Sequence, residues 1–194
     1  MTIKKKFTGV LILVVGNSGS GKDSIISGAL LKYPKNLKEV KMTKRYITRP
    51  PSEFEDNYSI TSDEFRAMEQ QGKFALKWKI YGLNYGVPVE IDEWLKKGHP
   101  VIVNVSRMII DEARKIYDNL RVVFIEVPLE ITIKRIKDRG RESGKLLQQR
   151  MQRAEKNQKL PGADFIVDNS GELDTAIDQF LIYLIKCVKN NQYQ

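Results

Sequence analysis

The chain has 194 residues, 41% of them hydrophobic, which is enough for one sizeable core and too few for two full domains. Lysine and arginine outnumber aspartate and glutamate by 33 to 24, for a net charge of +9, which favours polyanionic ligands. Many of the arginines fall in short loops flanked by glycine or proline rather than in a stripe with interleaved aromatics, so we do not expect a nucleic-acid binder. No apolar run approaches the roughly 20 residues that span a bilayer, and the single Cys187 can form no internal disulfide. We therefore expect a soluble, cytoplasmic protein without membrane contact, of unspecified oligomeric state.

Apolar runs separated by helical periodicity predict the strands of a parallel sheet. The first run, residues 7–15, is almost wholly apolar, as expected of a central strand buried on both faces. A glycine-rich loop follows it, and then a helix with an apolar face that ends before Pro34. Further runs of the same type are residues 101–105, 122–127 and 165–167. This alternation predicts one α/β domain over residues 1–194, with a central parallel sheet flanked by helices.

The first interruption of this alternation, at about residues 41–89, is expected to be an inserted subdomain that carries part of a binding site. Thr61 and Glu64 have the spacing of a capping box and predict a helix that ends near Gly72. Residues 75–81 alternate as a strand, in which Leu76, Trp78 and Ile80 share one face and Lys77, Lys79 and Tyr81 share the other. The two tryptophans of the chain are interpreted as packing residues.

The second interruption, at about residues 138–150, reads DRGRESGKLLQQR and lies between two helical segments. It is polar and rich in glycine and arginine, which is typical of a lid that closes over a ligand.

Residues 16–22 read GNSGSGK, directly after a predicted strand and before a predicted helix. In this G-x-x-x-x-G-K context, glycines let successive N–H groups point inward, the helix adds the positive end of its dipole, and the lysine reaches the transferring phosphates. The sequence therefore predicts a phosphate-binding loop for ATP. The residues assigned to it are Gly16, Asn17, Ser18, Gly19, Ser20, Gly21, Lys22, Asp23 and Ser24.

Asp23 stands where the usual loop has a serine or threonine that binds Mg²⁺, and the hydroxyl comes one residue later, at Ser24. A carboxylate is a ligand suited to Mg²⁺, directly or through water, so we expect Asp23 to be the metal contact. The alternative is that Asp23 only complements the positive end of its helix.

Five stretches together resemble the guanylate kinase superfamily and, within it, the ribose 1,5-bisphosphate phosphokinases of phosphonate breakdown, the PhnN family. They are GNSGSGKDS, RYITRPP, YGLNYGVPVEIDEWL, VNVSR and DRGRES. The resemblance implies a P-loop kinase fold and transfer of the ATP γ-phosphoryl group to ribose 1,5-bisphosphate, giving 5-phosphoribosyl 1-diphosphate. The alternatives are a guanylate kinase and a non-catalytic, guanylate-kinase-like binding module.

The resemblance also implies that the insertion at about residues 41–89 binds the acceptor, and it implies which residues do so. Arg49, Tyr58 and Tyr85 match the residues that hold the acceptor phosphate in guanylate kinases. Arg45, Lys77 and Val87 match the positions that read guanine there, and two cations with one apolar group suit a second phosphate better than a base. Asn104, Ser106 and Arg107 replace an acidic stretch and are expected at the acceptor sugar phosphate, as is Tyr81. Lys77 could instead belong to a solvated strand face, and Tyr81 to the core or its rim.

For the transfer itself, the resemblance assigns Arg139 and Arg150 to catalysis and Arg141 to ATP. The acceptor atom is an ionised phosphate oxygen, so no general base is required. Lys22, Mg²⁺ and these arginines would align the reactants and stabilise charge. Asp168 and Asn169, after the last predicted strand, are candidates for holding the adenine.

Overall fold

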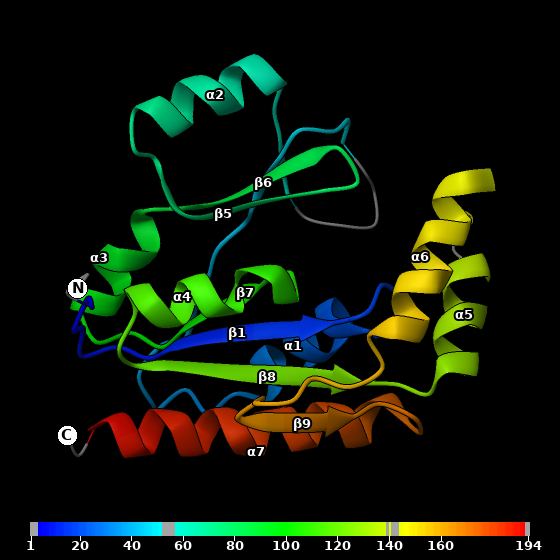
Figure 1. The fold of residues 1–194 in the computed structure, drawn as a ribbon. Coiled ribbons are helices and arrows are strands. Elements are labelled where there is room, and N and C mark those ends of the chain that lie inside the picture. Colours follow the sequence, from blue (N-terminus) through cyan, green and yellow to red (C-terminus); the bar gives the residue numbers. More distant parts are fainter. Residues whose placement is uncertain (1–3, 52–56, 139, 141–143, 193–194) are drawn as a thin grey trace.

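The computed structural model describes residues 4–51, 57–138, 140 and 144–192. Its larger sheet has five parallel strands in the order β2-β7-β1-β8-β9, with β1 in the centre (Figure 1). The strands are β1 (Leu11–Gly16), β2 (Lys41–Met42), β7 (Val101–Asn104), β8 (Leu120–Glu126) and β9 (Phe165–Asp168). The predicted α/β fold with a central parallel sheet is confirmed.

The central strand starts later than predicted, at Leu11 rather than at residue 7. Gly9 donates its backbone N–H to Leu95 O instead of to a neighbouring strand. From Leu11 onward every residue of β1 pairs with β8, and the first four also pair with β7. The apolar run therefore begins before the paired residues of β1, because the segment before Leu11 packs against the region of Leu95.

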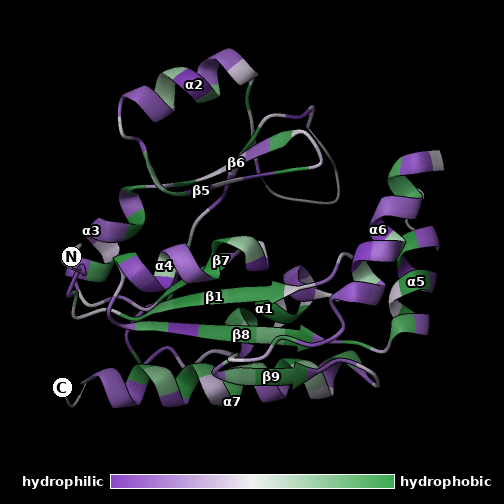
Figure 2. Cartoon of the chain, viewed as in Figure 1, coloured by the Kyte–Doolittle hydropathy of each residue, from purple (hydrophilic) through white to green (hydrophobic). Residues whose placement is uncertain are grey.

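The alternation of β1 divides the core into two clusters, one on each face of the larger sheet. Leu11, Leu13 and Val15 pack with residues of α3 (Glu90–Lys96), the short 3-10 helix η1 (Arg107–Ile109) and α4 (Ile110–Ile116). Ile12 and Val14 pack with α1 (Lys22–Lys32) and α7 (Leu173–Gln192). In Figure 2, β1 and β8 are largely hydrophobic, and they lie between helices that carry hydrophilic residues.

A second, smaller sheet lies over the first and has the order β4-β3-β6-β5. Its strands are β3 (Tyr46–Ile47), β4 (Tyr58–Ser59), β5 (Phe74–Ile80) and β6 (Leu83–Pro88). The capping box of Thr61 and Glu64 starts α2 (Ser62–Gln70), as predicted. The buried Ile47, Leu76 and Val87 of this sheet join the same core cluster as Leu11 and Leu13. The smaller sheet therefore shares its core with the larger one.

Tyr81 does not continue the alternation of β5, contrary to prediction. Ile80 pairs with Leu83, so Tyr81 and Gly82 form a two-residue hairpin loop. Both have positive φ angles, 52° and 77°, as a turn that matches the strand twist requires. The strand ends one residue earlier than the sequence pattern indicates, because the hairpin turn needs two residues.

Helices α5 (Leu129–Asp138) and α6 (Gly144–Lys156) pack together beyond the carboxyl ends of β1 and β8 (Figure 1). The predicted lid spans the end of α5 and the first half of α6. Its Arg139 and Arg141 lie outside the described residues. No helix in the described part of the chain is long and apolar enough to cross a membrane.

Candidate active site

The loop between β1 and α1 has the geometry of a phosphate cradle. Gly19 and Gly21 both have φ angles of +82°, a conformation that side chains with a Cβ rarely adopt. The Nζ atom of Lys22 lies over the loop and donates to Gly16 O at 2.9 Å and to Asn17 O at 3.0 Å. The ammonium group is thereby held at the centre of the loop, where a bound phosphate would meet it.

A glycine is also needed at position 21 because Asn169 lies close to it. Asn169, which follows β9 and is buried, donates its side-chain N–H to Ser20 O at 2.8 Å. A Cβ atom on Gly21 would lie 2.7 Å from Asn169 Nδ2. The last strand therefore supports the loop through a contact that only a glycine allows.

We expect Gly21→Ala to lower the free energy of unfolding by about 2 kcal/mol, since backbone strain and a steric clash add. Gly72→Ala is the matched control, because Gly72 has a φ of +67° and no heavy atom within 4 Å of an added Cβ. Urea denaturation of both variants measures the difference. Equal losses would contradict a role for the contact with Asn169.

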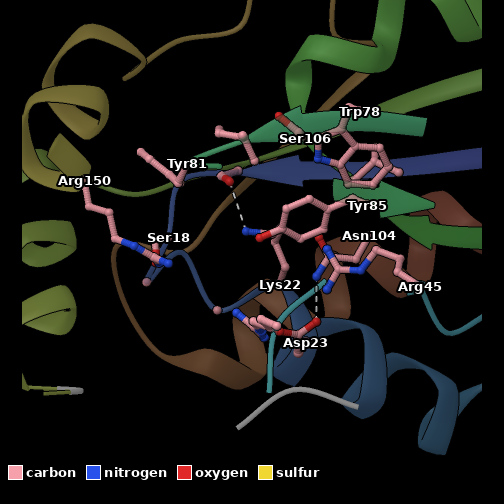
Figure 3. Close-up of a pocket in the computed structure, with 16 residues that line it drawn as sticks. Ser18, Lys22, Asp23, Arg45, Trp78, Tyr81, Tyr85, Asn104, Ser106 and Arg150 are labelled. Carbon is pink, nitrogen blue, oxygen red and sulfur yellow. Dashed lines mark hydrogen bonds between the residues drawn. The ribbon is translucent and has the colours of Figure 1, made fainter. Parts of the chain in front are cut away.

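A cavity of about 150 Å³ opens over the loop, at the carboxyl ends of β1 and β7 and beneath the smaller sheet (Figure 3). Ligands bind at this edge of parallel sheets because loops and helix N-termini meet there. The structure brings many of the predicted residues to it. Those that line it are Gly16, Ser18, Gly19, Gly21, Lys22, Asp23, Arg45, Arg49, Tyr81, Tyr85, Asn104, Ser106 and Arg150.

Asp23 and Asn104 meet in this cavity from different elements. Asn104, at the end of β7, donates its side-chain N–H to Asp23 Oδ1 at 2.7 Å (Figure 3). Asn104 is 6% exposed, and its Oδ1 atom accepts no hydrogen bond within the described chain. The bond fixes the carboxylate beside the phosphate loop and leaves the second oxygen of Asp23 available.

Asp23, held by Asn104, suits a Mg²⁺ ion that is bound mainly by the phosphates of a nucleotide. In the described residues there is no group of three or more histidine, cysteine, aspartate or glutamate side chains that could hold a metal. Mg²⁺ commonly takes one or two carboxylates and completes its shell with water and substrate phosphates. Asp23 faces the cavity, whereas Ser24 lines a different cavity.

Trp78 and Ile80 also line the main cavity, although the sequence interpretation assigned Trp78 to packing alone. The Trp78 ring stacks on Tyr85 with centroids 5.2 Å apart and an angle of 6° between the planes. The alternation of β5 correctly placed Trp78 on the buried face. What the alternation could not show is that this face covers a cavity at its edge as well as a core.

Tyr81 reaches the cavity from its position in the hairpin turn. The guanidinium carbons of Arg150 and Arg153, both on α6, lie 5.5 and 5.9 Å from the centroid of its ring. Arg150 also donates through Nη1 to Ser18 Oγ at 2.9 Å. Helix α6 thus contacts both the phosphate loop and the smaller sheet.

Arg107 lies beside the main cavity rather than in its lining, in a neighbouring cavity of about 80 Å³ that Arg153 also lines. Its terminal nitrogens donate to Asn157 O at 2.7 Å and Lys159 O at 3.1 Å, in the segment after α6. Asn157 O also accepts from the Asn17 side chain, at 3.1 Å. Burial, followed by the nearby charge of Arg153, lowers the pKa of Arg107. The predicted direct contact of Arg107 with the acceptor therefore stays a prediction, and the hydrogen bonds of Arg107 hold the segment that follows α6.

Two further predicted acceptor residues are not brought to the cavity. Lys77 is exposed on the outer face of β5, where its Nζ lies 2.5 Å from Glu69 Oε1 of α2. Tyr58 is 44% exposed, and its ring contacts Tyr46 and Lys44. For Lys77, this placement agrees with the alternative of a solvated strand face.

A third cavity, of about 550 Å³, lies on the other side of the loop. Its lining includes Gly19, Gly21, Ser24 and Asn169, together with Arg135 and Asp138 of α5. Asp168 does not line it, and instead accepts from Ser170 N at 2.9 Å. This cavity is large enough for a nucleoside and adjoins the end of the loop nearest α1.

Comparison with known proteins agrees with this geometry. A family model described as guanylate kinase matches residues 8–186. A ribose 1,5-bisphosphate phosphokinase PhnN of Pseudomonas paraeruginosa is 41% identical over 179 residues, which cover 91% of this chain and 96% of the relative. A protein of the same name from Pectobacterium atrosepticum is 38% identical over 173 residues, covering 88% and 90% of the two chains.

Solved structures show the same fold at lower identity. A guanylate kinase from Anaplasma phagocytophilum superposes with a TM-score of 0.64 at 16% identity, covering 94% of this chain and 90% of the other. A gluconokinase from Sinorhizobium meliloti gives a TM-score of 0.50 at 19% identity, covering 98% and 99%. Fold, phosphate loop and sequence similarity lead to one assignment: the chain belongs to the guanylate kinase family and, within it, to the PhnN family of ribose 1,5-bisphosphate phosphokinases.

Proposed function

We propose that this protein is a kinase that transfers the γ-phosphoryl group of ATP, with Mg²⁺, to ribose 1,5-bisphosphate and forms 5-phosphoribosyl 1-diphosphate. The observation that carries the proposal is the charge of the main cavity. Of the described residues that line it, Lys22, Arg45, Arg49 and Arg150 are cationic, and Asp23 is the one carboxylate. Such a lining matches an acceptor with two phosphate groups, each with a charge of about −1.5 to −2 at neutral pH.

The same lining disfavours a guanine base as the acceptor's second group. Reading guanine needs an acceptor for its ring and exocyclic N–H donors, and a buried donor left without a partner costs about 1–3 kcal/mol. Beneath the smaller sheet the cavity offers Arg45, Arg49 and the Trp78–Tyr85 stack, and the one carboxylate among its described lining residues is bonded to Asn104 beside the phosphate loop. An acceptor that carries phosphate is therefore a better match than a base for a lining of this charge.

The residues of the chain supply alignment and charge rather than proton transfer. The attacking phosphate oxygen is already ionised, so the site needs no general base. Lys22 at the loop centre and Arg150 from the lid helix flank the position where phosphate would transfer (Figure 3). They lower the repulsion between donor and acceptor and stabilise charge that spreads over the transferring group. When bound, Mg²⁺ would add a further positive charge on the phosphates, held on the protein side by Asp23.

The position of α6 also favours transfer over hydrolysis. Asn17 donates its side-chain N–H groups to Ala154 O and Asn157 O at the end of this helix, and Arg150 bonds Ser18. These bonds hold the helix against the phosphate loop. A covered site excludes water, which would otherwise accept the phosphoryl group.

Parallel assays of ADP release with ribose 1,5-bisphosphate, GMP and no acceptor test the proposal. We expect turnover with the sugar bisphosphate to exceed turnover with GMP by about 100-fold or more, because unpaired base donors cost binding energy in the transition state. Detection of the diphosphate product excludes hydrolysis of ATP as the source of ADP. Turnover with GMP alone would establish a guanylate kinase instead, and no turnover with any acceptor would favour a binding module.

A further inference from the structure

Beside the main cavity lies a small basic hollow, of which the proposed transfer step uses Arg150 but neither Arg107 nor Arg153. We call it the arginine niche and define it by Tyr81, Ser106, Arg107, Arg150 and Arg153. It has a volume of about 80 Å³ and is closed on one side by the first residues of the phosphate loop, Gly16, Asn17 and Ser18. Three guanidinium groups from two separate parts of the chain therefore converge on one hollow.

Two of the three arginines of the niche, Arg107 and Arg153, have no counter-ion among the described residues. None of the described residues that line the hollow is a carboxylate, and within that part of the chain neither Arg107 nor Arg153 forms a salt bridge. The charges of these two arginines are close enough that Arg153 contributes to lowering the pKa of Arg107, after burial. Gathering like charges in a partly buried hollow is unfavourable unless an anion neutralises them.

The arginines have different tasks in this arrangement. Both terminal nitrogens of Arg107 already donate to backbone carbonyls after α6, so Arg107 serves to hold that segment. Arg153 makes one long side-chain bond, from Nη2 to Ser106 Oγ at 3.3 Å, and lies over the Tyr81 ring. A guanidinium carries several N–H donors in a fork that matches phosphate oxygens. Most of the donors of Arg153 are thus available to a ligand.

The place of the niche identifies which ligand can reach it. It shares Gly16, Ser18, Tyr81, Ser106 and Arg150 with the main cavity, so one molecule can extend from one into the other. The cavity large enough for a nucleoside instead adjoins Gly19, Gly21 and Ser24 and shares no residue with the niche. A donor nucleotide thus extends away from the niche, and the acceptor is the molecule that reaches it.

We propose that the arginine niche holds the phosphate of the acceptor that does not react, the 5-phosphate, and that Arg153 is its principal binding residue. This inference rests on the proposed function. It assigns a role to Arg153 and to the hairpin turn at Tyr81, whose positive φ places the ring under both lid arginines. Arg107 acts on the same site indirectly, by holding the end of α6.

The first test compares steady-state kinetics of the wild type with Arg153→Ala and Arg153→Lys. We expect Arg153→Ala to raise the KM for ribose 1,5-bisphosphate by about 10- to 100-fold, the usual effect of losing hydrogen bonds to a charged group. The KM for ATP should change by less than about threefold, since the donor lies elsewhere. Arg153→Lys should recover part of the loss, because it restores the charge without the fork.

Lys156→Ala is the matched control, since it removes one exposed positive charge from the same helix without touching any of the cavities described above. Thermal unfolding of each variant identifies any loss of folded protein. An unchanged acceptor KM in a folded Arg153→Ala protein would overturn the proposal, as would a rise confined to the KM for ATP.

The second test removes the phosphate rather than the arginine. Ribose 5-phosphate and ribose 1-phosphate each compete with ribose 1,5-bisphosphate for the acceptor site, and their inhibition constants are measured on the wild type and on Arg153→Ala. We expect the substitution to raise the inhibition constant of ribose 5-phosphate by about 10-fold or more and to leave the inhibition constant of ribose 1-phosphate unchanged. Equal effects on both inhibitors, or none on either, would overturn the assignment of the 5-phosphate to the niche.

The kinetic results distinguish failure of the proposed function from failure of the niche assignment. A wild type that does not turn over ribose 1,5-bisphosphate contradicts the kinase proposal whatever Arg153 does. A wild type that is active, with an Arg153→Ala variant that matches it in both tests, contradicts the niche alone.

Discussion

Replacing Lys22 by methionine is expected to lower kcat by about 10³-fold, the scale on which single preorganised charges act in phosphoryl transfer. Its Nζ is held by Gly16 O and Asn17 O at the centre of the loop, so the charge is in place before the reactants arrive. The effect should fall mainly on kcat, because the transferring group gains the most from a nearby cation in the transition state. Initial rates at saturating ATP and acceptor measure it.

Lys35→Met is the matched control for this variant, since Lys35 is exposed in the segment after α1 and lines none of the cavities described above. We expect Lys22→Arg to fail to restore activity, because a planar guanidinium does not replace a compact ammonium over the loop. A Lys22→Met protein within about tenfold of wild-type kcat would contradict the role of Lys22 in transfer.

The second large effect concerns Asp23. We expect Asp23→Ala to raise the Mg²⁺ concentration needed for half-maximal activity by about 10- to 100-fold, as when a group that supports a metal is lost. The cause is removal of the carboxylate that Asn104 orients beside the loop. Activity measured across a Mg²⁺ titration at fixed ATP gives the shift.

If Asp23 only interacts with the positive end of its helix dipole, the Asp23→Ala variant should behave differently. An acidic residue in a first helical turn contributes about 0.3–1 kcal/mol through the helix dipole, and its loss would leave the Mg²⁺ titration unchanged. Glu130→Ala is the matched control, since Glu130 is exposed in the first turn of α5. If Asp23→Ala and Glu130→Ala lose similar stability and retain the wild-type Mg²⁺ dependence, Asp23 is not the metal contact.

The arginines of α6 show how much more of the site could have been found in the sequence. Arg150 and Arg153 are three residues apart in α6, so both lie on one helix face, and here that face meets Tyr81. The spacing alone was a readable signal for Arg153. The partner of this face was not, since Tyr81 belongs to a hairpin turn far away in the sequence.

Lys77 and Arg107 show the opposite situation, in which a plausible residue type was assigned to a place that tertiary contacts alter. The side chain of Lys77 follows the outward alternation of β5 and pairs with Glu69. Arg107 follows β7 by three residues, close to the site, but its donors are used by carbonyls of the segment after α6. A resemblance places residues near a site, whereas competing partners decide which of them face it.

The sequence by itself determined the phosphate loop, the parallel sheet and the capped helix of the insertion, because glycine spacing, apolar periodicity and capping act over a few neighbouring residues. Only the tertiary structure decided the shape of the acceptor site. The Asp23–Asn104 bond joins residues 81 positions apart, and the Arg150–Ser18 bond joins residues 132 apart. Contacts of this kind depend on how sheets and helices pack, which no local pattern encodes. The arginine niche exists for the same reason, since its arginines become neighbours only when α6 lies against the loop.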